Sequence, residues 1–204
     1  MERIKVAVLV SGGGTNLGAL IAAEKNGIIK SGKLSLVISN KVGAYALERA
    51  RTAGIEALTV TKADCGSQEA FENRLIDELS SRGIELIVLA GFMSILSEKF
   101  TSTFKDRIIN VHPSLIPSFC GVGYYGLRVH EAALGYGVKV TGATVHYVNE
   151  IPDGGKIILQ KSVNVEDSDT PEILQRRVME EAEWIILPEA CELVSAKLLS
   201  EKAK

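Results

Sequence analysis

The feature that most constrains the fold is a repeated alternation between short apolar runs and segments with helical periodicity. The apolar runs, rich in β-branched residues, occupy residues 4–10, 34–39, 56–61, 85–91 and 107–112. The segments with helical spacing of apolar residues lie between them, at 17–27, 44–54, 67–83 and 96–104. Continuous apolar strands that alternate with helices are typical of parallel sheets covered on both faces. We therefore predict an α/β fold with a mostly parallel, Rossmann-like open sheet and helices on both faces.

This rhythm changes after residue 112. Segment 113–126 is rich in proline, glycine and aromatic residues and is expected to form a loop. Strand-like runs at 138–149 and 156–165, joined by the turn-rich "EIPDGG", predict an antiparallel C-terminal pair of strands added to the sheet. A helix is expected over 169–187, with Pro171 in its first turn and Pro188 kinking or restarting it. No repeat or linker divides the chain, so we expect a single domain over residues 1–204.

Composition excludes several classes of function. The 204 residues are 46% hydrophobic and 24% charged with a net charge of −2, and no acidic or basic block suggests a nucleic-acid or membrane partner. The first apolar run is too short for a signal peptide or a membrane span, so we expect a cytoplasmic protein. Cys65, Cys120 and Cys191 lack metal-ligand spacing and the chain has three histidines, so we expect no metal site.

The glycine-rich stretch "SGGGTN", residues 11–16, joins the first predicted strand to the first predicted helix. Such a loop brings backbone N–H groups close to an anion, and the helix start adds free N–H groups and a positive dipole end. It matches neither the dinucleotide fingerprint nor the nucleotide phosphate loop. The alternative is a tight turn in which Thr15 or Asn16 caps the helix. Its place at the carboxyl end of a strand favours phosphate binding.

The stretch "RIINVHPSLIPSF", residues 107–119, carries two polar side chains at the end of an apolar strand. Strand side chains alternate, so Asn110 and His112 should point to the same face. Histidine can exchange a proton near neutral pH, and asparagine can donate a hydrogen bond to an oxygen that gains negative charge. The alternative is a polar pair that anchors the following loop. His130, expected on a short helix, and His146, expected within a strand, are interpreted as structural.

Two further stretches have both a structural and a functional interpretation. Asp153 of "EIPDGG" fits ordinary Asp-Gly turn chemistry, but a carboxylate near His112 would favour the protonated imidazole and orient its ring. The apolar run "LAGFMSIL", residues 89–96, follows a predicted strand. It could pack in the core or form one wall of a pocket for a flat apolar ring.

Together these stretches resemble a known family. "VLVSGGGTNL", "ISNK…LERA…AGI", "LAGFMSILS", "INVHPSLIPSF", "GATVHYV" and "DGGKIILQ" occur in the order and spacing of the folate-dependent phosphoribosylglycinamide formyltransferases, over nearly the whole chain. The resemblance implies a formyltransferase-type sheet and the small-molecule substrates glycinamide ribonucleotide and formyl folate. The implied reaction transfers the formyl group of 10-formyltetrahydrofolate to the amine of glycinamide ribonucleotide in de novo purine (IMP) biosynthesis, without a metal.

The resemblance also implies roles for individual residues. The catalytic residues are Asn110, His112 and Asp153; the substrate phosphate site is Gly14, Thr15 and Asn16; Glu183 approaches the substrate ribose; the folate-binding residues are Met93, Ser94, Ile95, Leu96 and Asn110. The C-terminal helix needs a one-residue gap to align. Ser94 replaces an arginine of many relatives and Gln68 a basic residue near the acidic folate tail. Segment 119–134 is longer than the family form and predicts a reshaped flap.

Other functions remain as alternatives. A formyltetrahydrofolate deformylase would use the same three residues for hydrolysis but would carry an N-terminal regulatory domain, whereas the first strand here begins at residue 4. A methionyl-tRNA formyltransferase would need a basic RNA-binding domain, which the net charge of −2 disfavours. A non-catalytic phosphate- or nucleotide-binding α/β protein would explain "SGGGTN" but not Asn110, His112 and Asp153. The sequence leaves a homodimer open.

Overall fold

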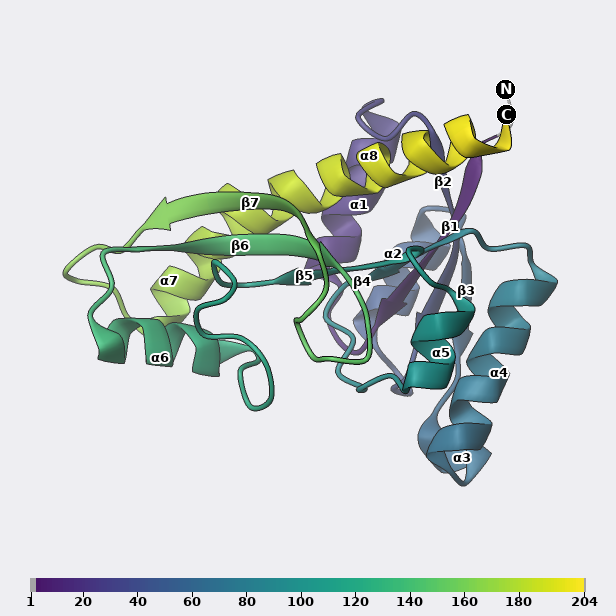
Figure 1. Cartoon of the computed structure of the whole chain (residues 1–204), viewed down its shortest axis with the longest axis horizontal. Coiled ribbons are helices and arrows are strands. Elements are labelled where there is room, and N and C mark those ends of the chain that lie inside the picture. Colours follow the sequence, from purple (N-terminus) through teal and green to yellow (C-terminus); the bar gives the residue numbers. More distant parts are fainter. Residues whose placement is uncertain (1–2, 204) are drawn as a thin grey trace.

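The computed structural model describes residues 3–203 and contains one seven-stranded sheet in the order β3-β2-β1-β4-β5-β6-β7 (Figure 1). The strands are β1 (Ile4–Val10), β2 (Gly32–Ser39), β3 (Glu56–Thr59), β4 (Leu86–Leu89), β5 (Ile108–His112), β6 (Val140–Tyr147) and β7 (Ile157–Asn164). Strands β1 to β5 are parallel to one another, whereas β6 is antiparallel to both β5 and β7. The predicted parallel sheet and its antiparallel C-terminal pair are confirmed.

The helices lie between the strands as the periodicity predicted, with ends that differ by one to three residues. They are α1 (Thr15–Lys25), α2 (Tyr45–Thr52), α3 (Lys62–Cys65), α4 (Gln68–Ser81), α5 (Glu98–Thr103), α6 (Leu127–Tyr136), α7 (Pro171–Val178), the π-helical segment η1 (Met179–Glu183) and α8 (Trp184–Lys202). The one-turn helix α3 was not predicted. Within residues 3–203, no helix combines the length and the apolar character that crossing a bilayer requires.

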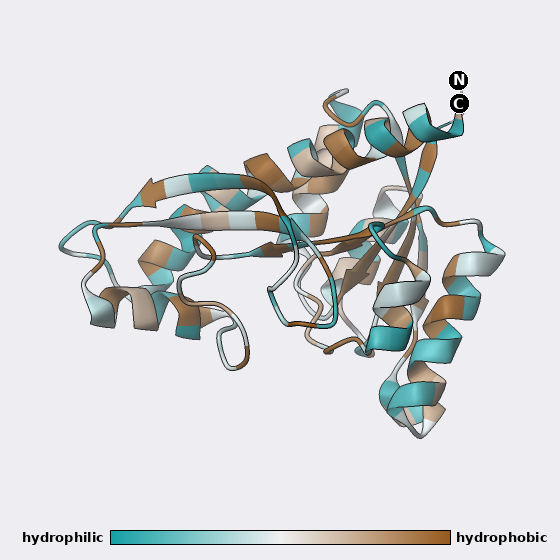
Figure 2. Cartoon of the chain, viewed as in Figure 1, coloured by the Kyte–Doolittle hydropathy of each residue, from teal (hydrophilic) through white to brown (hydrophobic). Residues whose placement is uncertain are grey.

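Both faces of the sheet are buried, and the alternation of side chains along β1 shows how. Val6 and Val8 belong to the apolar cluster beneath α1, α2, α7 and α8, whereas Ala7 and Leu9 belong to the cluster beneath α4 and α5. Figure 2 shows hydrophobic residues concentrated in the central strands and hydrophilic ones on the outer faces of the helices. Burial of β1 on both faces explains why it is apolar at every position except Lys5.

The strand order places a crevice at the carboxyl ends of β1 and β4. The chain runs outward from β1 through β2 to β3 and then returns to the other side of β1 as β4. Ligands of open α/β sheets bind at such a reversal of strand order. Ser11, after β1, accepts a hydrogen bond from the Met93 backbone N–H, after β4, at 2.8 Å. The glycine-rich loop and the 89–96 segment therefore meet at this crevice.

The C-terminal helical region corrects one expectation. Pro171 occupies the first turn of α7, as predicted, and Thr170 caps this helix. The helix does not restart at Pro188, because α8 runs through it and the irregularity is η1, which precedes Trp184. Pro188 has no N–H to donate to the carbonyl of Trp184, four residues earlier. Trp184 is where the π-helical hydrogen-bond pattern of η1 gives way to the α-helical pattern of α8. A π-helical turn holds one residue more than an α-helical turn, which matches the one-residue gap in the resemblance.

Candidate active site

Strand β5 positions the first two candidate catalytic residues. Ile109 and Val111 pack into the cluster beneath α1 and α8, so Asn110 and His112 point to the opposite face, as predicted. The antiparallel register of β5 and β6 places Asn110 opposite His146. The sheet itself therefore sets the imidazole of His146 beside the amide of Asn110.

Asp153 reaches both imidazoles from the turn between β6 and β7. Its Oδ2 lies 3.4 Å from Nδ1 of His112, and its Oδ1 lies 3.5 Å from Nε2 of His146. Asp153 has a left-handed backbone (φ 56), and a Cβ on Gly155 would lie 1.7 Å from the Tyr147 carbonyl oxygen. The turn interpretation of this stretch is confirmed, and the same turn places the carboxylate beside His112.

His146 orients Asn110 through a defined tautomer. Its Nδ1 lies 2.7 Å from the Tyr147 carbonyl oxygen, which can only accept, so Nδ1 donates. Nε2 then accepts from Asn110 Nδ2 at 3.2 Å. The structural role expected for His146 is too narrow, because its hydrogen bond turns the amide of a candidate catalytic residue. Sequence reasoning missed this role because it depends on the pairing register of two strands more than 30 residues apart.

His112 is buried and held by acceptors on both sides. Its Nε2 donates to the Phe119 carbonyl oxygen at 2.9 Å. Burial lowers its pKa below the ordinary value, although the Asp153 carboxylate and the Phe119 carbonyl partly raise it. The expectation that Asp153 keeps this imidazole protonated is therefore corrected: the opposing effect of burial is larger. Burial also raises the pKa of Asp153, but the nearby imidazoles of His146 and His112 and the hydrogen bond from the Gly121 N–H outweigh it, so the pKa is lowered and the carboxylate stays ionised.

The segment 113–126 covers this cluster as an ordered loop. The Gly121 backbone N–H donates to Asp153 Oδ2 at 2.8 Å. Thr144 on β6 holds the start of the loop, because its Oγ1 donates to the Ser114 carbonyl at 2.7 Å and accepts from the Ile116 N–H at 3.1 Å. The loop contacts two of the candidate catalytic residues through backbone groups, which no side-chain motif could reveal.

A pocket adjoins the cluster and contains most of the residues expected to bind folate. It is lined by Asn110, His146 and Asp153 and by parts of segments 92–96 and 148–153. Ser94, Ile95 and Leu96 are among the lining residues. Met93 is not, and its backbone N–H is bound to Ser11.

The two residues that depart from the family pattern are engaged within the protein. Ser94 Oγ accepts from Asn40 Nδ2 at 2.8 Å. Gln68 Nε2 donates to Glu72 Oε1 at 2.8 Å and to the Ile95 carbonyl at 3.2 Å. Among the described residues that line the pocket there is no lysine or arginine.

The glycine-rich loop forms the other end of the crevice. Gly14, with φ 71, is the N-cap of α1 and no side chain caps the helix, so the alternative role of Thr15 or Asn16 as a cap is wrong. Asn16 Nδ2 donates to Glu183 Oε2 at 2.7 Å. Glu183 is 6% exposed, and burial raises its pKa although the Asn16 hydrogen bond lowers it. The residues expected to bind the substrate phosphate and ribose are thus brought together by α1 and η1.

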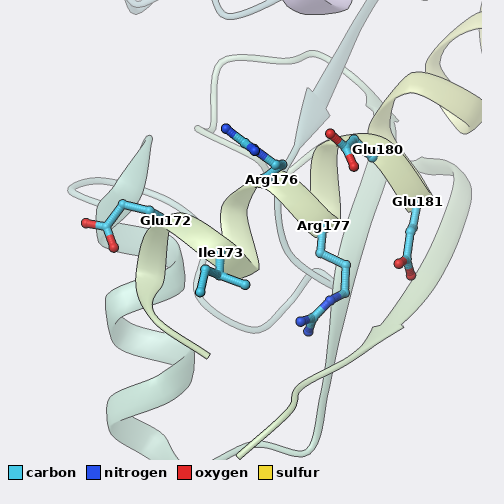
Figure 3. A pocket seen from close by; sticks show the side chains of 6 residues that line it. All are labelled: Glu172, Ile173, Arg176, Arg177, Glu180 and Glu181. Atoms are coloured by element: carbon cyan, nitrogen blue, oxygen red, sulfur yellow. The ribbon is translucent and has the colours of Figure 1, made fainter. Parts of the chain in front are cut away.

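A second hollow lies along the C-terminal helices (Figure 3) and is lined by Glu172, Ile173, Arg176, Arg177, Glu180 and Glu181. Its charges are mixed, and Arg177 is already paired with Asp169 at 2.6 Å. It shares no residue with the candidate site. Within residues 3–203, no three His, Cys, Asp or Glu residues are grouped so that they could hold a metal ion.

Comparison with proteins of known sequence identifies the family of this chain. The formyl transferase family matches residues 4–191. The chain is 42% identical over 175 residues to the phosphoribosylglycinamide formyltransferase of Escherichia coli (strain K12), covering 86% of this chain and 80% of that one. It is also 43% identical to the trifunctional purine biosynthetic protein adenosine-3 of Gallus gallus, over 96% of this chain but 19% of that protein. The chloroplastic phosphoribosylglycinamide formyltransferase of Arabidopsis thaliana is 38% identical, and the chain covers 62% of it.

The chain thus spans less than two thirds of these last two relatives, whereas it matches a solved structure over most of its length. Glycinamide ribonucleotide transformylase 1 from Symbiobacterium toebii superimposes with a TM-score of 0.89 at 42% identity, over 96% of this chain and 89% of that one. The identity and coverage exceed what a shared fold alone would produce. The chain therefore belongs to the formyl transferase family and groups with its phosphoribosylglycinamide formyltransferases.

Proposed function

We propose that this chain, as a single formyltransferase domain, transfers the formyl group of 10-formyltetrahydrofolate to the amine of glycinamide ribonucleotide. The observation that carries the proposal is the convergence of Asn110, His112 and Asp153 beside one pocket. The names of the relatives supply the acceptor, glycinamide ribonucleotide, and the formyl group, whereas the folate donor rests on the resemblance of the sequence. Support for one domain is that all described strands form one sheet.

The chemistry requires a donor for an oxygen that gains charge. The amine nitrogen forms a bond to the formyl carbon, the bond from that carbon to N10 of the folate breaks, and a proton passes from the amine to N10. Asn110 has a second N–H besides the one bound to His146, and the Nε2–H of His112 exchanges the Phe119 carbonyl for the formyl oxygen during the reaction. Both donate to the formyl oxygen, and one such donor typically contributes ~10²–10³ in rate.

The buried imidazole of His112 can respond to the negative charge that develops on the formyl oxygen only during the reaction. In the resting protein, burial holds the pKa of His112 down. The formyl oxygen and Asp153 then both carry negative charge beside His112. These charges favour the protonated imidazole, because an opposite charge nearby raises the pKa of histidine. His112 therefore stabilises the oxyanion by gaining a proton as the oxyanion forms, and afterwards passes a proton toward N10.

The test is Asp153→Asn, which keeps the shape of the side chain but removes its charge. We expect kcat to fall by about 10²–10⁴ with an unchanged melting temperature, because general acid–base assistance is worth that much. Formyl transfer is followed spectroscopically with a folate analogue, with and without glycinamide ribonucleotide. Asp167→Asn is the matched control, because Asp167 is exposed and, among the residues that the structure describes, pairs only with Lys139.

Each other outcome has its own meaning. A fully active Asp153→Asn protein contradicts the mechanism. Release of formate by the unaltered protein in the absence of the amine favours the deformylase alternative. Absence of turnover with both substrates favours a binding protein.

A further inference from the structure

Helix α2 contacts the glycine-rich loop directly, and the side chain of Arg49 donates a hydrogen bond to this loop. From this contact we infer that Arg49 is a positioning residue for substrate phosphate: it holds the Gly13 carbonyl so that the loop presents its N–H groups to the phosphate. The inference rests on the proposed function for the identity of the phosphorylated substrate. Arg49 lies in the "LERA" stretch that carries part of the resemblance, but the sequence analysis assigned it no role.

Two donors of α2 hold two successive carbonyls of the loop. The Ala46 backbone N–H donates to the Gly12 carbonyl at 3.1 Å, and Arg49 Nε donates to the Gly13 carbonyl at 2.9 Å. A Cβ on Gly14 would lie 2.6 Å from Ala46 Cβ and 3.6 Å from Arg49 Cδ. The loop is thus packed against one face of α2, and only glycine fits at position 14.

Holding the carbonyls determines where the N–H groups point. In a trans peptide the carbonyl and the following N–H point in opposite directions. With the Gly12 and Gly13 carbonyls turned toward α2, the N–H groups of Gly13 and Gly14 are turned away from it. Within residues 3–203, the backbone N–H groups of positions 13–16 donate to no protein acceptor. Four unpaired N–H groups in a row at a helix start are suited to bind a phosphate.

The guanidinium of Arg49 also retains its charge. It stacks over the Tyr45 ring at 4.9 Å and is half-buried, and within residues 3–203 it pairs with no carboxylate. Arg51, on the same helix, is instead exposed and forms an ion pair with Glu48. Arg49 therefore adds positive potential to the loop in addition to its hydrogen bond.

A second observation at the loop points to a ligand. Asn16 is 8% exposed, and its Oδ1 has no hydrogen-bond partner within the described chain although its Nδ2 is bound to Glu183. A buried acceptor without a partner is unfavourable, so such atoms in native proteins usually meet a ligand or water. A substrate hydroxyl next to the phosphate satisfies this oxygen.

Three variants separate the hydrogen bond from the charge. Arg49→Met keeps the length but removes both, Arg49→Gln keeps a donor without charge, and Arg49→Lys keeps both. We expect Arg49→Met to raise KM for glycinamide ribonucleotide roughly 10- to 100-fold, since hydrogen bonds to charged groups are worth that much. KM for the formyl folate and kcat should stay near the parent values. Arg49→Gln should recover part of the loss and Arg49→Lys more, while Arg51→Met serves as the control.

Removal of the substrate phosphate tests the inference most directly. With glycinamide riboside, which lacks the phosphate, Arg49→Met and the parent protein should have equal kcat/KM. An equal loss on both substrates overturns the inference, because Arg49 would then act on the site as a whole.

Binding of ribose 5-phosphate gives a readout that does not depend on formyl transfer. Titration with ribose 5-phosphate should shift the amide NMR signals of residues 13–16 in the parent. Arg49→Met should raise the dissociation constant by the same factor as it raises KM for glycinamide ribonucleotide. If this binding is observed without any formyl transfer, the proposed function fails and the role of Arg49 stands. Equal affinity in the parent and Arg49→Met overturns the inference.

Discussion

At the scale of single residues, the three buried histidines differ in whether their ring nitrogens have partners. His112 and His146 each have a carboxylate oxygen of Asp153 within 3.5 Å. His130 on α6 is fully buried, and neither of its ring nitrogens has a partner within the described chain. Burial, with a smaller effect of His112, lowers the pKa of His130 to about 4. His130 is therefore neutral in the folded protein at pH values where it is protonated in the unfolded chain.

This difference makes stability depend on pH. Because the folded pKa is depressed, the contribution of His130 is fully present above pH 6.5 and is lost as pH falls toward about 4. Because one pKa unit corresponds to ~1.4 kcal/mol, the unfolding free energy lost is about 3 kcal/mol. We expect His130→Leu to flatten the pH dependence of the unfolding free energy between these values. Urea unfolding of the parent and of His130→Leu at a series of pH values measures this dependence. Parallel curves of unfolding free energy against pH would contradict the expectation.

At the scale of elements, β6 connects the catalytic residues to the loop that covers them. One position of this strand pairs His146 with Asn110, and two residues earlier Thr144 holds the Ser114 carbonyl and the Ile116 N–H. The same loop supplies the Phe119 carbonyl to His112 and the Gly121 N–H to Asp153. The loop conformation and the geometry of the catalytic cluster are therefore determined by one strand.

Thr144→Val tests this connection, because valine keeps the shape and removes the hydroxyl. The buried Ser114 carbonyl and Ile116 N–H lose their partner, so we expect a loss of about 1–3 kcal/mol in unfolding free energy. Hydrogen exchange in segment 113–126 should become faster, and kcat should fall. Thr141→Val is the control, because Thr141 lies in the same strand and makes no side-chain hydrogen bond within residues 3–203. Unchanged exchange in the segment would show that the loop is held by other contacts.

At the scale of the whole molecule, the site is distributed over the carboxyl ends of three neighbouring strands. The glycine-rich loop follows β1, the pocket segment follows β4, and Asn110 and His112 end β5. Glu183 approaches from η1, near the other end of the chain. A substrate that reaches from the loop to the catalytic cluster therefore contacts segments from the first and the last thirds of the sequence.

Binding at such a site should stabilise the fold as a unit. At a ligand concentration about 100 times its Kd, the unfolding free energy should rise by about 2.7 kcal/mol. We expect this rise with glycinamide ribonucleotide and a smaller one with glycinamide riboside at the same concentration. Denaturant unfolding with each ligand measures it, and equal effects of the two would contradict a phosphate site at the loop.

Several elements followed from local patterns alone. Apolar runs and helical spacing predicted β1 to β5 and their helices, because periodicity encodes which side of an element is buried. Asn110 and His112 could be assigned to one face for the same reason. His146 and Arg49 could not, since their roles depend on the β5–β6 register and on how α2 packs against the loop. The continuation of α8 through Pro188 depended on the neighbouring π-helical segment.

The sequence by itself determined the order of strands and helices along the chain and which polar residues lie at the strand ends. These properties depend on neighbours in the chain. Only the tertiary structure decided that Asp153 lies between two imidazoles and that α2 turns the carbonyls of the glycine-rich loop toward itself. It also decided that burial lowers the pKa of His112 more than the charge of Asp153 raises it. Each of these depends on groups brought together across many residues, and on the water that packing removes from around them.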